Sequence, residues 1–266
     1  MNAPTPFRAS ARAAFSLGLE TTLASRRAWL TGLLLGLPAV LALAYRAAAL
    51  AGVELHLPGW QVYGDFAVTL YWVGLALPLV ALLQASGYAE EVEARTIVYL
   101  LTRPASRGAL LVGRFAAYAV FALGVTLVAQ LVTFLLLGTQ DGTGAFFGRV
   151  PGLLRDAGVL ALALLSYGAL FTLLGVLLRR PLLPGLGFLF GWELLANLPG
   201  YLPRLTVARH LRGLLPYSPP MEGLFGLFTP LPVSGLACLL SLALVIAGGL
   251  GLAGFVFSRR EYVLPQ

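Results

Sequence analysis

The feature that most constrains this chain is a series of long apolar runs, separated by short stretches rich in arginine, proline or acidic residues. A helix that crosses a bilayer needs about 20 consecutive apolar residues. Six runs reach that length, at about 28–48, 66–86, 111–138, 156–178, 182–201 and 232–257. Hydrophobic residues make up 59% of the chain and charged residues 11%, whereas soluble domains have roughly 25% charged residues. The sequence therefore predicts an all-α integral membrane protein, a single transmembrane domain over residues 1–266 with six transmembrane helices.

The distribution of arginine predicts the orientation of these spans. All 18 basic residues are arginine, and the net charge is +7. Arginines that flank membrane spans explain this charge, so no nucleic acid partner is expected. With a cytoplasmic N-terminus, 12 of the arginines lie on the cytoplasmic side and six on the other. The positive-inside rule therefore favours a multi-pass protein of the inner (plasma) membrane with both termini in the cytoplasm.

An amphipathic helix is predicted at about 6–26, before the first span. Apolar residues recur every four positions, while polar and charged residues occupy a neighbouring face: Phe7, Ala11, Phe15, Leu19 and Leu23 against Arg8, Arg12, Ser16 and Glu20. This pattern is typical of a helix that lies in the membrane interface. A solvated tail would not need the regular spacing. A cleavable signal peptide ending near Ala42-Leu43-Ala44 is disfavoured, because the charged stretch before it is too long.

Several kinds of site are excluded by residue content. The chain has no lysine, so it cannot form a Walker A phosphate-binding loop. Its histidines, His56 and His210, are far apart, and Cys238 is its one cysteine, so neither a metal site nor an internal disulfide is expected. We also expect no catalytic residues, because no nucleophile–base set or pair of intramembrane carboxylates appears in the sequence.

The glycine motifs predict close helix packing. Residues 249–254 match the G-x-G-x-x-G dinucleotide fingerprint but lie inside the last apolar run, with no strand before them. Gly32 and Gly36, like Gly187 and Gly191, have the G-xxx-G spacing. Small residues at this spacing let helices approach one another, and we expect these contacts within one protomer.

Two segments connect spans on the predicted outer side. Residues 139–155 contain Gly, Asp and Thr turn signals and are expected to form a loop. Residues 202–231 contain several prolines but stay apolar, which favours short interfacial or re-entrant pieces over free coil.

One acid, Glu193, lies well inside a predicted span. It precedes Pro199 by six residues, which places it about 9 Å from the outer end of the helix at 1.5 Å per residue. An intramembrane acid is a candidate functional site, here for transport. The alternative is a carboxylate that reaches outward or hydrogen-bonds a neighbouring helix, beside Trp192 and Asn197.

The segment 87–114 is more polar than a short membrane turn requires. It begins with Glu90, Glu91 and Glu93, continues through apolar residues 97–101, and ends in a stretch that contains proline, serine and glycine. Its position between two spans places it on the cytoplasmic side. This pattern indicates a structured segment at the membrane surface that binds another protein.

A second cytoplasmic turn repeats part of this segment. Residues 100–108 and 177–185 both read L-L-x-R-P-x-x-x-G. An Arg-Pro pair can simply end a span and anchor it. Alternatively, Arg179 and Arg180 form a second contact with the same cytosolic partner, although for this turn we favour the anchoring role.

The order of interfacial helix, spans and acidic loop resembles the permease subunits of the ABC-2 type transporter family. The signature of that family between spans 2 and 3 is E-x-G-T, then apolar residues, then P-x-S-R followed by G-K. The matching residues are Glu93, Thr96, Leu100, Leu101, Pro104, Ser106, Arg107 and Gly113. Arg95 replaces the usual glycine and Arg114 the usual lysine. The motif covers about 25 residues, whereas the similarity in span order covers nearly the whole chain.

This resemblance implies an ATP-driven transporter, an exporter, built from two spanning subunits and two separate ATPase subunits. The second spanning subunit would be a copy of this chain or a homologous permease. ATP and Mg²⁺ would bind the ATPase, and this chain would hold no cofactor. The loop would act as a coupling helix, whose acidic N-terminal end is favoured by the helix dipole and whose apolar residues dock in a groove of the ATPase. The expected contact residues are Glu90, Glu91, Glu93, Arg95, Thr96, Leu100, Arg103, Pro104, Ser106 and Arg107.

Two other functions remain open at this point. The chain could be an integral-membrane enzyme acting on lipid-linked substrates, or a membrane anchor or assembly factor without transport activity. The transported substrate does not follow from the sequence. Apolar spans fit lipids and amphiphiles, while polymers, peptides and metal-handling systems stay open.

Overall fold

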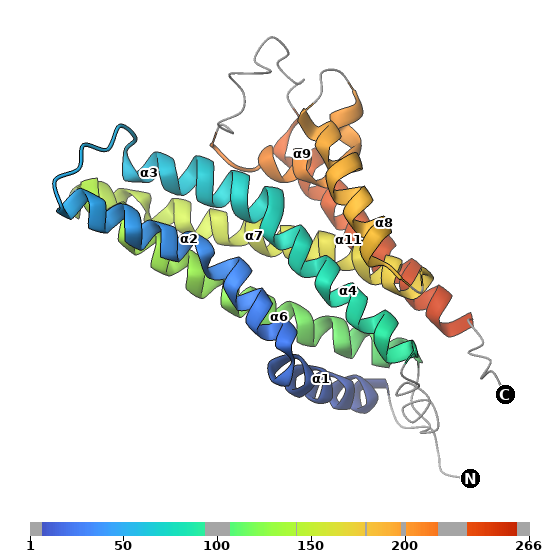
Figure 1. The fold of residues 1–266 in the computed structure, drawn as a ribbon. Coiled ribbons are helices and arrows are strands. Elements are labelled where there is room, and N and C mark those ends of the chain that lie inside the picture. The colour runs from blue at the N-terminus through green and yellow to red at the C-terminus, as the bar shows by residue number, and fades with distance from the viewer. Residues whose placement is uncertain are drawn as a thin grey trace.

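The computed structural model describes residues 7–93, 107–141, 143–178, 180–197, 201–217 and 233–259, and within these residues it contains helices and no strands (Figure 1). The first half comprises α1 (Phe7–Ala24), α2 (Arg26–Leu50), α3 (Gly59–Gln61), the π-helix η1 (Val62–Ala76), α4 (Leu77–Glu93) and α6 (Arg107–Gly138). The second half comprises η2 (Thr139–Asp141), α7 (Thr143–Leu177), α8 (Leu182–Gly187), η3 (Phe188–Trp192), η4 (Glu193–Asn197), η5 (Leu202–Leu205), α9 (Val207–Arg212) and α11 (Gly235–Arg259).

Five helices of the described chain are long and apolar enough to cross a membrane. They are Arg26–Leu50, Gly59–Ala85, Gly108–Gly138, Phe146–Leu177 and Gly235–Arg259. The second of them runs through α3, η1 and α4 without a break. These helices cover the predicted spans 1, 2, 3, 4 and 6, so the multi-pass all-helical class is confirmed.

The predicted fifth span, 182–201, is not confirmed. The apolar helix here covers Leu182–Leu195, which is shorter than a bilayer-spanning helix. The backbone changes from α to π geometry at Phe188 and to 3₁₀ geometry at Glu193, and the helical segment ends at Asn197. Farther along the chain, η5 and α9 are short helices and not free coil over the described part of 202–231, and their interfacial or re-entrant placement stays a prediction.

The predicted outer loop at 139–155 is wrong. After the short η2, helix α7 begins at Thr143 and includes Pro151. An aromatic contact stabilises this extension, since the rings of Phe146 and Phe134 lie 5.3 Å apart. Tertiary packing therefore outweighs the turn-forming composition of this segment.

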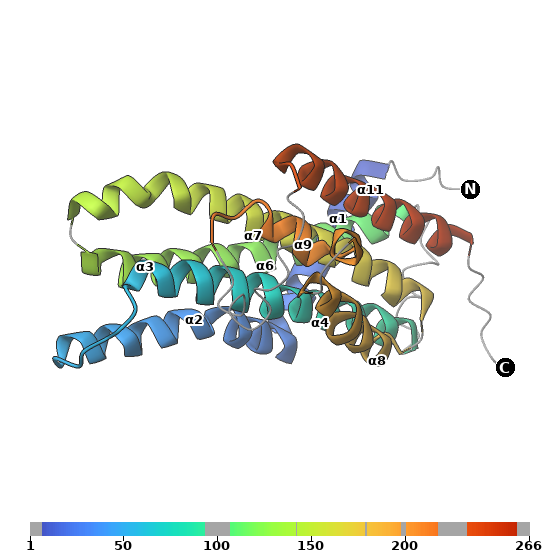
Figure 2. The ribbon, with the colours of Figure 1, turned by 90° about the horizontal axis from the view of Figure 1, so that it is seen from above.

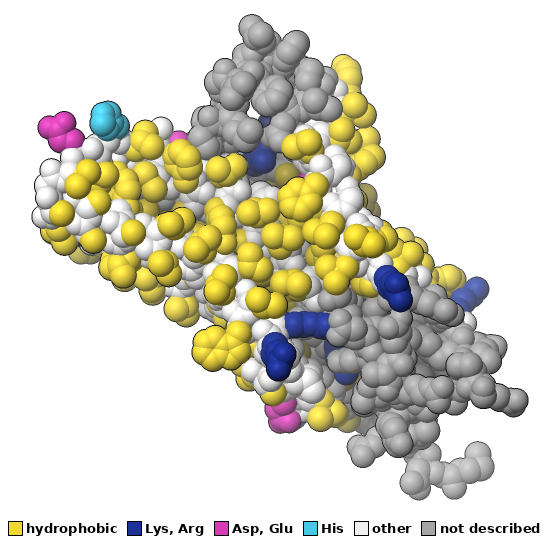
Figure 3. All heavy atoms as spheres, in the orientation of Figure 1, with side chains coloured by type: hydrophobic (Ala, Val, Ile, Leu, Met, Phe, Trp, Pro, Cys, Tyr) yellow, Lys and Arg dark blue, Asp and Glu magenta, His cyan; other side chains and the backbone are white. Residues whose placement is uncertain are grey.

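The long helices α2, α6, α7 and the continuous η1–α4 helix run alongside one another, and α8, α9 and α11 pack to one side (Figures 1 and 2). The core lies between η1–α4 and α7, where Trp72, Tyr167 and Phe171 are fully buried. By contrast, α2 and α11 are mostly exposed along their lengths. The face over α2 and α4 is covered by hydrophobic side chains, and basic side chains lie mainly toward its α1 end (Figure 3).

Helix α2 contains a proline whose effect is compensated by the neighbouring helix. Pro38 lacks an N–H, so it cannot donate to the carbonyl of Leu34, four residues earlier. The hydroxyl of Tyr71 donates to this carbonyl at 2.7 Å, and the indole nitrogen of Trp72 donates to the carbonyl of Leu35 at 3.0 Å. A carbonyl without a donor is costly inside a membrane, so these bonds stabilise the contact between α2 and η1.

Glycines permit several close helix contacts. A Cβ on Gly175 would lie 2.7 Å from the carbonyl oxygen of Ala85, and a Cβ on Gly249 would lie 3.1 Å from that of Ala169. The predicted packing role of the 249–254 stretch is thus confirmed at Gly249. Close contacts within the protomer are not confirmed for Gly32 and Gly36, nor for Gly187 and Gly191, because no described atom lies within 4 Å of a Cβ built at these positions.

Helix α1 packs on the start of α6 through a face of small residues. Its buried residues are Ser10, Ala14, Gly18 and Thr22. Gly113 of α6 lies so close that a Cβ there would be 2.4 Å from the carbonyl oxygen of Ala11. The large apolar residues Phe7 and Leu23 stay about half exposed. The predicted apolar face is therefore adjacent to the face that packs on α6.

Candidate coupling surface and buried acidic sites

The structure brings the two ends of the segment 87–114 to the same end of the bundle. Helix α4 ends at Glu93 and α6 begins at Arg107, and both ends lie toward α1 (Figure 1). The predicted contact residues Arg95, Thr96, Leu100, Arg103, Pro104 and Ser106 lie outside the described residues. The family-signature residue Gly113 contacts α1, so at this position the signature has a packing role.

The three acids of this segment end one helix and do not begin another. Glu90, Glu91 and Glu93 occupy the last turn of α4. The residues that follow them, 94–106, lie outside the described part of the chain, so the expected coupling helix is not confirmed and stays a prediction. At the C-terminal end of a helix the dipole disfavours negative charge. Their position therefore does not stabilise α4 through the helix dipole.

The second predicted contact lies at the same end of the bundle. Arg180 is exposed in the turn between α7 and α8, while Arg179 is outside the described part of the chain. Helix α8 packs closely on α4, because a Cβ on Gly185 would lie 2.1 Å from a methyl carbon of Leu82. The turn that contains Arg180 leads into α8, and α8 is a neighbour of α4.

Glu193 is buried and hydrogen-bonded. Its Oε1 accepts the backbone N–H of Val207 at 3.1 Å, and its Oε2 accepts that of Ala208 at 2.8 Å. Oε2 also accepts the hydroxyl of Tyr167, from α7, at 3.0 Å. The carboxylate therefore joins three segments of the chain: η4, which carries it, α7, and the first turn of α9. Of the two sequence-based interpretations, this geometry agrees with hydrogen bonding to a neighbouring helix, and it leaves a role in transport untested.

The threonine before α9 completes this contact. Thr206 precedes the helix with an extended backbone, and its hydroxyl accepts the N–H of Arg209 at 3.3 Å. The N-terminal N–H groups of a helix have no partners within it. Glu193 and Thr206 together supply acceptors for three of them, because threonine is a favoured N-cap and a carboxylate suits the positive end of the helix dipole.

A second buried acid, Asp156, binds Tyr217, which lies at the C-terminal end of the described segment 201–217. Its side chain is fully buried in α7, and its Oδ2 accepts the hydroxyl of Tyr217 at 2.7 Å. Its Oδ1 lies 3.3 Å from a guanidinium nitrogen of Arg155. The hydroxyl of the buried Tyr63 accepts the side-chain amide of Gln130 at 3.1 Å.

Aromatic rings surround this second acid in the half of the bundle that lies away from α1 (Figure 1). The ring of Trp60 lies 5.4 Å from that of Tyr63 and 5.6 Å from that of Tyr217. Gly64 makes room for Tyr217, because a Cβ there would lie 2.2 Å from the ring. Burial raises the pKa of the Tyr217 hydroxyl above its usual value, and the hydrogen bond to Asp156 raises it further. The hydroxyl thus remains a donor at neutral pH.

The sequence did not predict the Asp156 site. The fourth span was expected to begin near residue 156, which would place this acid at a helix end in contact with water. Because α7 begins at Thr143, Asp156 lies within the membrane-spanning helix Phe146–Leu177. Together, Asp156 and Glu193 fasten residues 201–217 to α7 at two points. Both carboxylates bind hydrogen-bond donors of this chain, which fits positioning better than reaction with a substrate.

Comparison with protein-family models finds a match over residues 24–190, to the ABC-2 family transporter protein. The chain belongs to this family. The match covers most of the chain and runs from the start of α2 into η3, so it includes the segment 87–114 and the turn at 178–181. A search among curated proteins finds no match to the chain. The family and the apolar helices together make this a multi-pass membrane protein of an ABC-2 type transporter.

Proposed function

We propose that this chain is the permease subunit of an ATP-driven exporter and that a separate ABC ATPase supplies the energy. Membership of the ABC-2 family carries this proposal. A chain without lysine cannot form the phosphate-binding loop of an ATPase, so the nucleotide must bind elsewhere. ATP and Mg²⁺ belong to that partner, and this chain holds no cofactor.

The proposed ATPase contact lies at the α1 end of the bundle. The end of α4 with its acids, the start of α6 and the exposed Arg180 all face this end. Segments on neighbouring helices would respond together to movement of a bound ATPase. Residues 87–114 form the principal contact in this proposal, and Arg179 and Arg180 form a second one. With the α1 end in the cytoplasm, both termini of the described chain are cytoplasmic, as the arginine distribution predicts.

The surface of α2 supports the proposed pairing with a second permease. Gly32 and Gly36 have the small-xxx-small spacing, and a Cβ built on either would meet no atom of the described residues within 4 Å. Trp29 and Leu33 on the same helix are largely exposed. Close packing of small residues is a principal means of helix association in membranes. Helix α2 is therefore our proposed contact surface for the second subunit, a copy of this chain or a homologous permease.

The test is a charge reversal in the last turn of α4. The double variant E91R/E93R should insert into the membrane normally but lose co-purification of the ATPase in mild detergent, measured by mass spectrometry of the partners. It should also lose ATP-dependent transport. The matched control is E20R, which reverses an exposed acid on α1 at the same end of the bundle.

Retention of both the ATPase and transport in E91R/E93R would remove this segment from the mechanism. Equal loss in E20R would indicate a general effect of charge at this end of the protein. A wild-type protein that purifies intact and never brings an ATPase with it would contradict the proposed function itself.

A further inference from the structure

An arginine pair, Arg149 and Arg155, lies over aromatic rings at the end of the bundle opposite α1 (Figure 1). The guanidinium carbon of Arg149 is 5.0 Å from the ring centre of Trp60, and that of Arg155 is 5.9 Å from the ring centre of Tyr217. The two rings contact each other, with their centres 5.6 Å apart. Both arginines come from α7 and Trp60 from α3, so the arginine pair lies where these helices meet.

Gly152 separates the two arginines on α7 and has no side chain to fill the space beside them. A Cβ built on it would lie 3.6 Å from the ring of Trp60 and 3.7 Å from Nη2 of Arg155. Both distances are ordinary van der Waals contacts, so the position would accept a side chain without a clash. A larger side chain here would lie between Trp60 and Arg155, at the centre of the group.

Arg155 has hydrogen-bond donors to offer a ligand. Its Nε and Nη2 donate to Oδ1 of Asp156 at 3.4 and 3.3 Å, and among the described residues its Nη1 has no hydrogen-bond partner. Its side chain is 43% exposed, so a ligand can reach it. A guanidinium that lies over a ring contacts it with its flat face, and the N–H groups along its edge can still bind phosphate oxygens in a planar fork.

The charge of this group favours an anion. Two guanidiniums and one carboxylate leave a net positive charge. Asp156 is hydrogen-bonded on both oxygens, since Oδ2 accepts the hydroxyl of Tyr217 and Oδ1 accepts the guanidinium of Arg155. The bonds to Arg155 are longer than the about 2.7–2.9 Å of a strong charge-assisted bond. Asp156 therefore only partly satisfies this arginine.

The position of the arginine pair along α7 matches the level of lipid headgroups. The spanning helix Phe146–Leu177 has 32 residues, which is about 48 Å at 1.5 Å per residue, whereas the hydrocarbon core is about 30 Å thick. About 20 residues cross this core, and counted back from Leu177 they reach residue 158. Arg149 then lies in the headgroup region and Arg155 at its inner edge, where a long side chain reaches outward.

We infer that the arginine pair binds the phosphate of an anionic phospholipid, in the leaflet at the end of the bundle opposite α1. Arg149 and Arg155 donate to the phosphate oxygens across Gly152, and the glycerol of the lipid lies against the ring of Trp60. Tryptophan is enriched at this level of membrane proteins for such contacts. The site is separate from the ATPase contact and does not rest on the proposed function.

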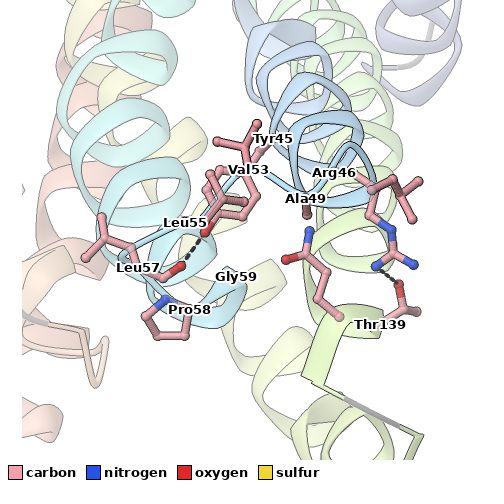
Figure 4. A pocket seen from close by; sticks show the side chains of 11 residues that line it. Tyr45, Arg46, Ala49, Val53, Leu55, Leu57, Pro58, Gly59 and Thr139 are labelled. Carbon is pink, nitrogen blue, oxygen red and sulfur yellow. Dashed lines mark hydrogen bonds between the residues drawn. The ribbon is translucent and has the colours of Figure 1, made fainter.

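Arg46 provides a matched control at the same end of the bundle. It belongs to α2, which lies on the other side of α3 and α6 from α7 (Figure 2). Its guanidinium donates to the hydroxyl of Thr139 at 3.2 Å, in the hollow between the end of α2 and the start of α3 (Figure 4). It has the same charge as the arginine pair and makes no contact with the lipid in this proposal.

The test measures binding of labelled phosphatidylglycerol to the purified protein in neutral detergent, with phosphatidylcholine, glycerol 3-phosphate and inorganic phosphate as competitors. We expect all three to compete at least about tenfold more weakly than unlabelled phosphatidylglycerol. R149Q should weaken binding about tenfold, which corresponds to about 1.4 kcal/mol, whereas R46Q should bind as the wild type does. Equal effects of R149Q and R46Q would overturn the site, because they would indicate general attraction of anionic lipid.

A second variant fills the site without removing a charge. G152L should weaken lipid binding while leaving the lipid-free melting temperature unchanged or higher, because leucine is a better helix former than glycine. The control G158L, on the same helix where a Cβ meets no described atom within 4 Å, should bind lipid normally. Wild-type binding by G152L would overturn the site. Competition by glycerol 3-phosphate as strong as that by the lipid would overturn the lipid assignment in favour of a free anion.

Discussion

Replacement of Glu193 by glutamine tests whether this acid fastens α9 to the bundle. The carboxylate accepts three hydrogen bonds, from the N–H groups of Val207 and Ala208 and from the hydroxyl of Tyr167. A glutamine has one acceptor oxygen. Placed at the Oε2 position, that oxygen keeps two of the bonds, and the new NH₂ group then faces the N–H of Val207.

The expected destabilisation follows from these contacts. A buried N–H without a partner costs about 1–3 kcal/mol, and bonds to a neutral acceptor are weaker than bonds to a charged one. Removal of a buried charge returns part of this loss, because the carboxylate no longer has to be desolvated. We expect a net loss of about 2 kcal/mol. In a protein of this size that corresponds to a fall in melting temperature of about 4–8 °C.

The assay combines thermal unfolding in detergent with limited trypsin digestion. Residues 201–217 contain Arg204, Arg209 and Arg212, so a released segment offers three cleavage sites. E193Q should be cut in this segment at temperatures where the wild type is resistant, before the rest of the protein unfolds. The control E20Q, at an exposed position on α1, should change neither measurement. Wild-type melting and digestion of E193Q would refute the fastening role.

Three further predictions concern single contacts. Gly64→Ala should lower the melting temperature by several degrees, since the new Cβ would lie 2.2 Å from the ring of Tyr217. The control Gly74→Ala on the same helix should be tolerated, because its Cβ meets its nearest atom at 3.5 Å. Equal melting temperatures of the two variants would contradict the packing described. Gly113→Leu should release α1 and let it unfold locally, so that trypsin cuts after its exposed Arg8 and Arg12, whereas Gly124→Leu, where a Cβ meets no described atom within 4 Å, should leave α1 resistant; resistance of the first variant would show that α1 holds by other contacts. Burial raises the pKa of Tyr217, so this tyrosine stays neutral in the folded protein while it ionises near pH 10 in the unfolded chain. Its contribution to stability is therefore lost as the pH rises above about 10. Tyr217→Phe should make this loss smaller in alkaline unfolding curves, and an unchanged curve would contradict the argument.

The sequence predicted the spans well where an apolar run alone determines the helix. The first span, expected at 28–48, corresponds to Arg26–Leu50, and the last, expected at 232–257, corresponds to Gly235–Arg259. Both helices are mostly exposed, so their form depends little on the rest of the protein. Length and hydrophobicity are sufficient to predict such helices.

Tertiary contacts explain the errors elsewhere. The turn-forming residues before position 156 are helical because Phe146 packs on Phe134. The predicted fifth span is shortened where Glu193 turns to bond the start of α9. The hydrogen bond between Tyr217 and Asp156 joins residues 61 positions apart, and no local pattern in one sequence indicates such a pair.

The two attachment points of residues 201–217 also determine the order in which the buried acids and their hydrogen-bond donors are synthesised at the ribosome. Asp156 leaves the ribosome after Tyr63 and Gln130 but 61 residues before Tyr217, so α7 enters the bilayer while its buried acid still lacks this donor. Glu193 likewise waits for the backbone of Val207 and Ala208, 14 and 15 residues later. A nascent chain that stops before residue 201 therefore carries two acids at membrane depth that lack some of their hydrogen-bond donors. Synthesis of the next 17 residues, 201–217, supplies these donors.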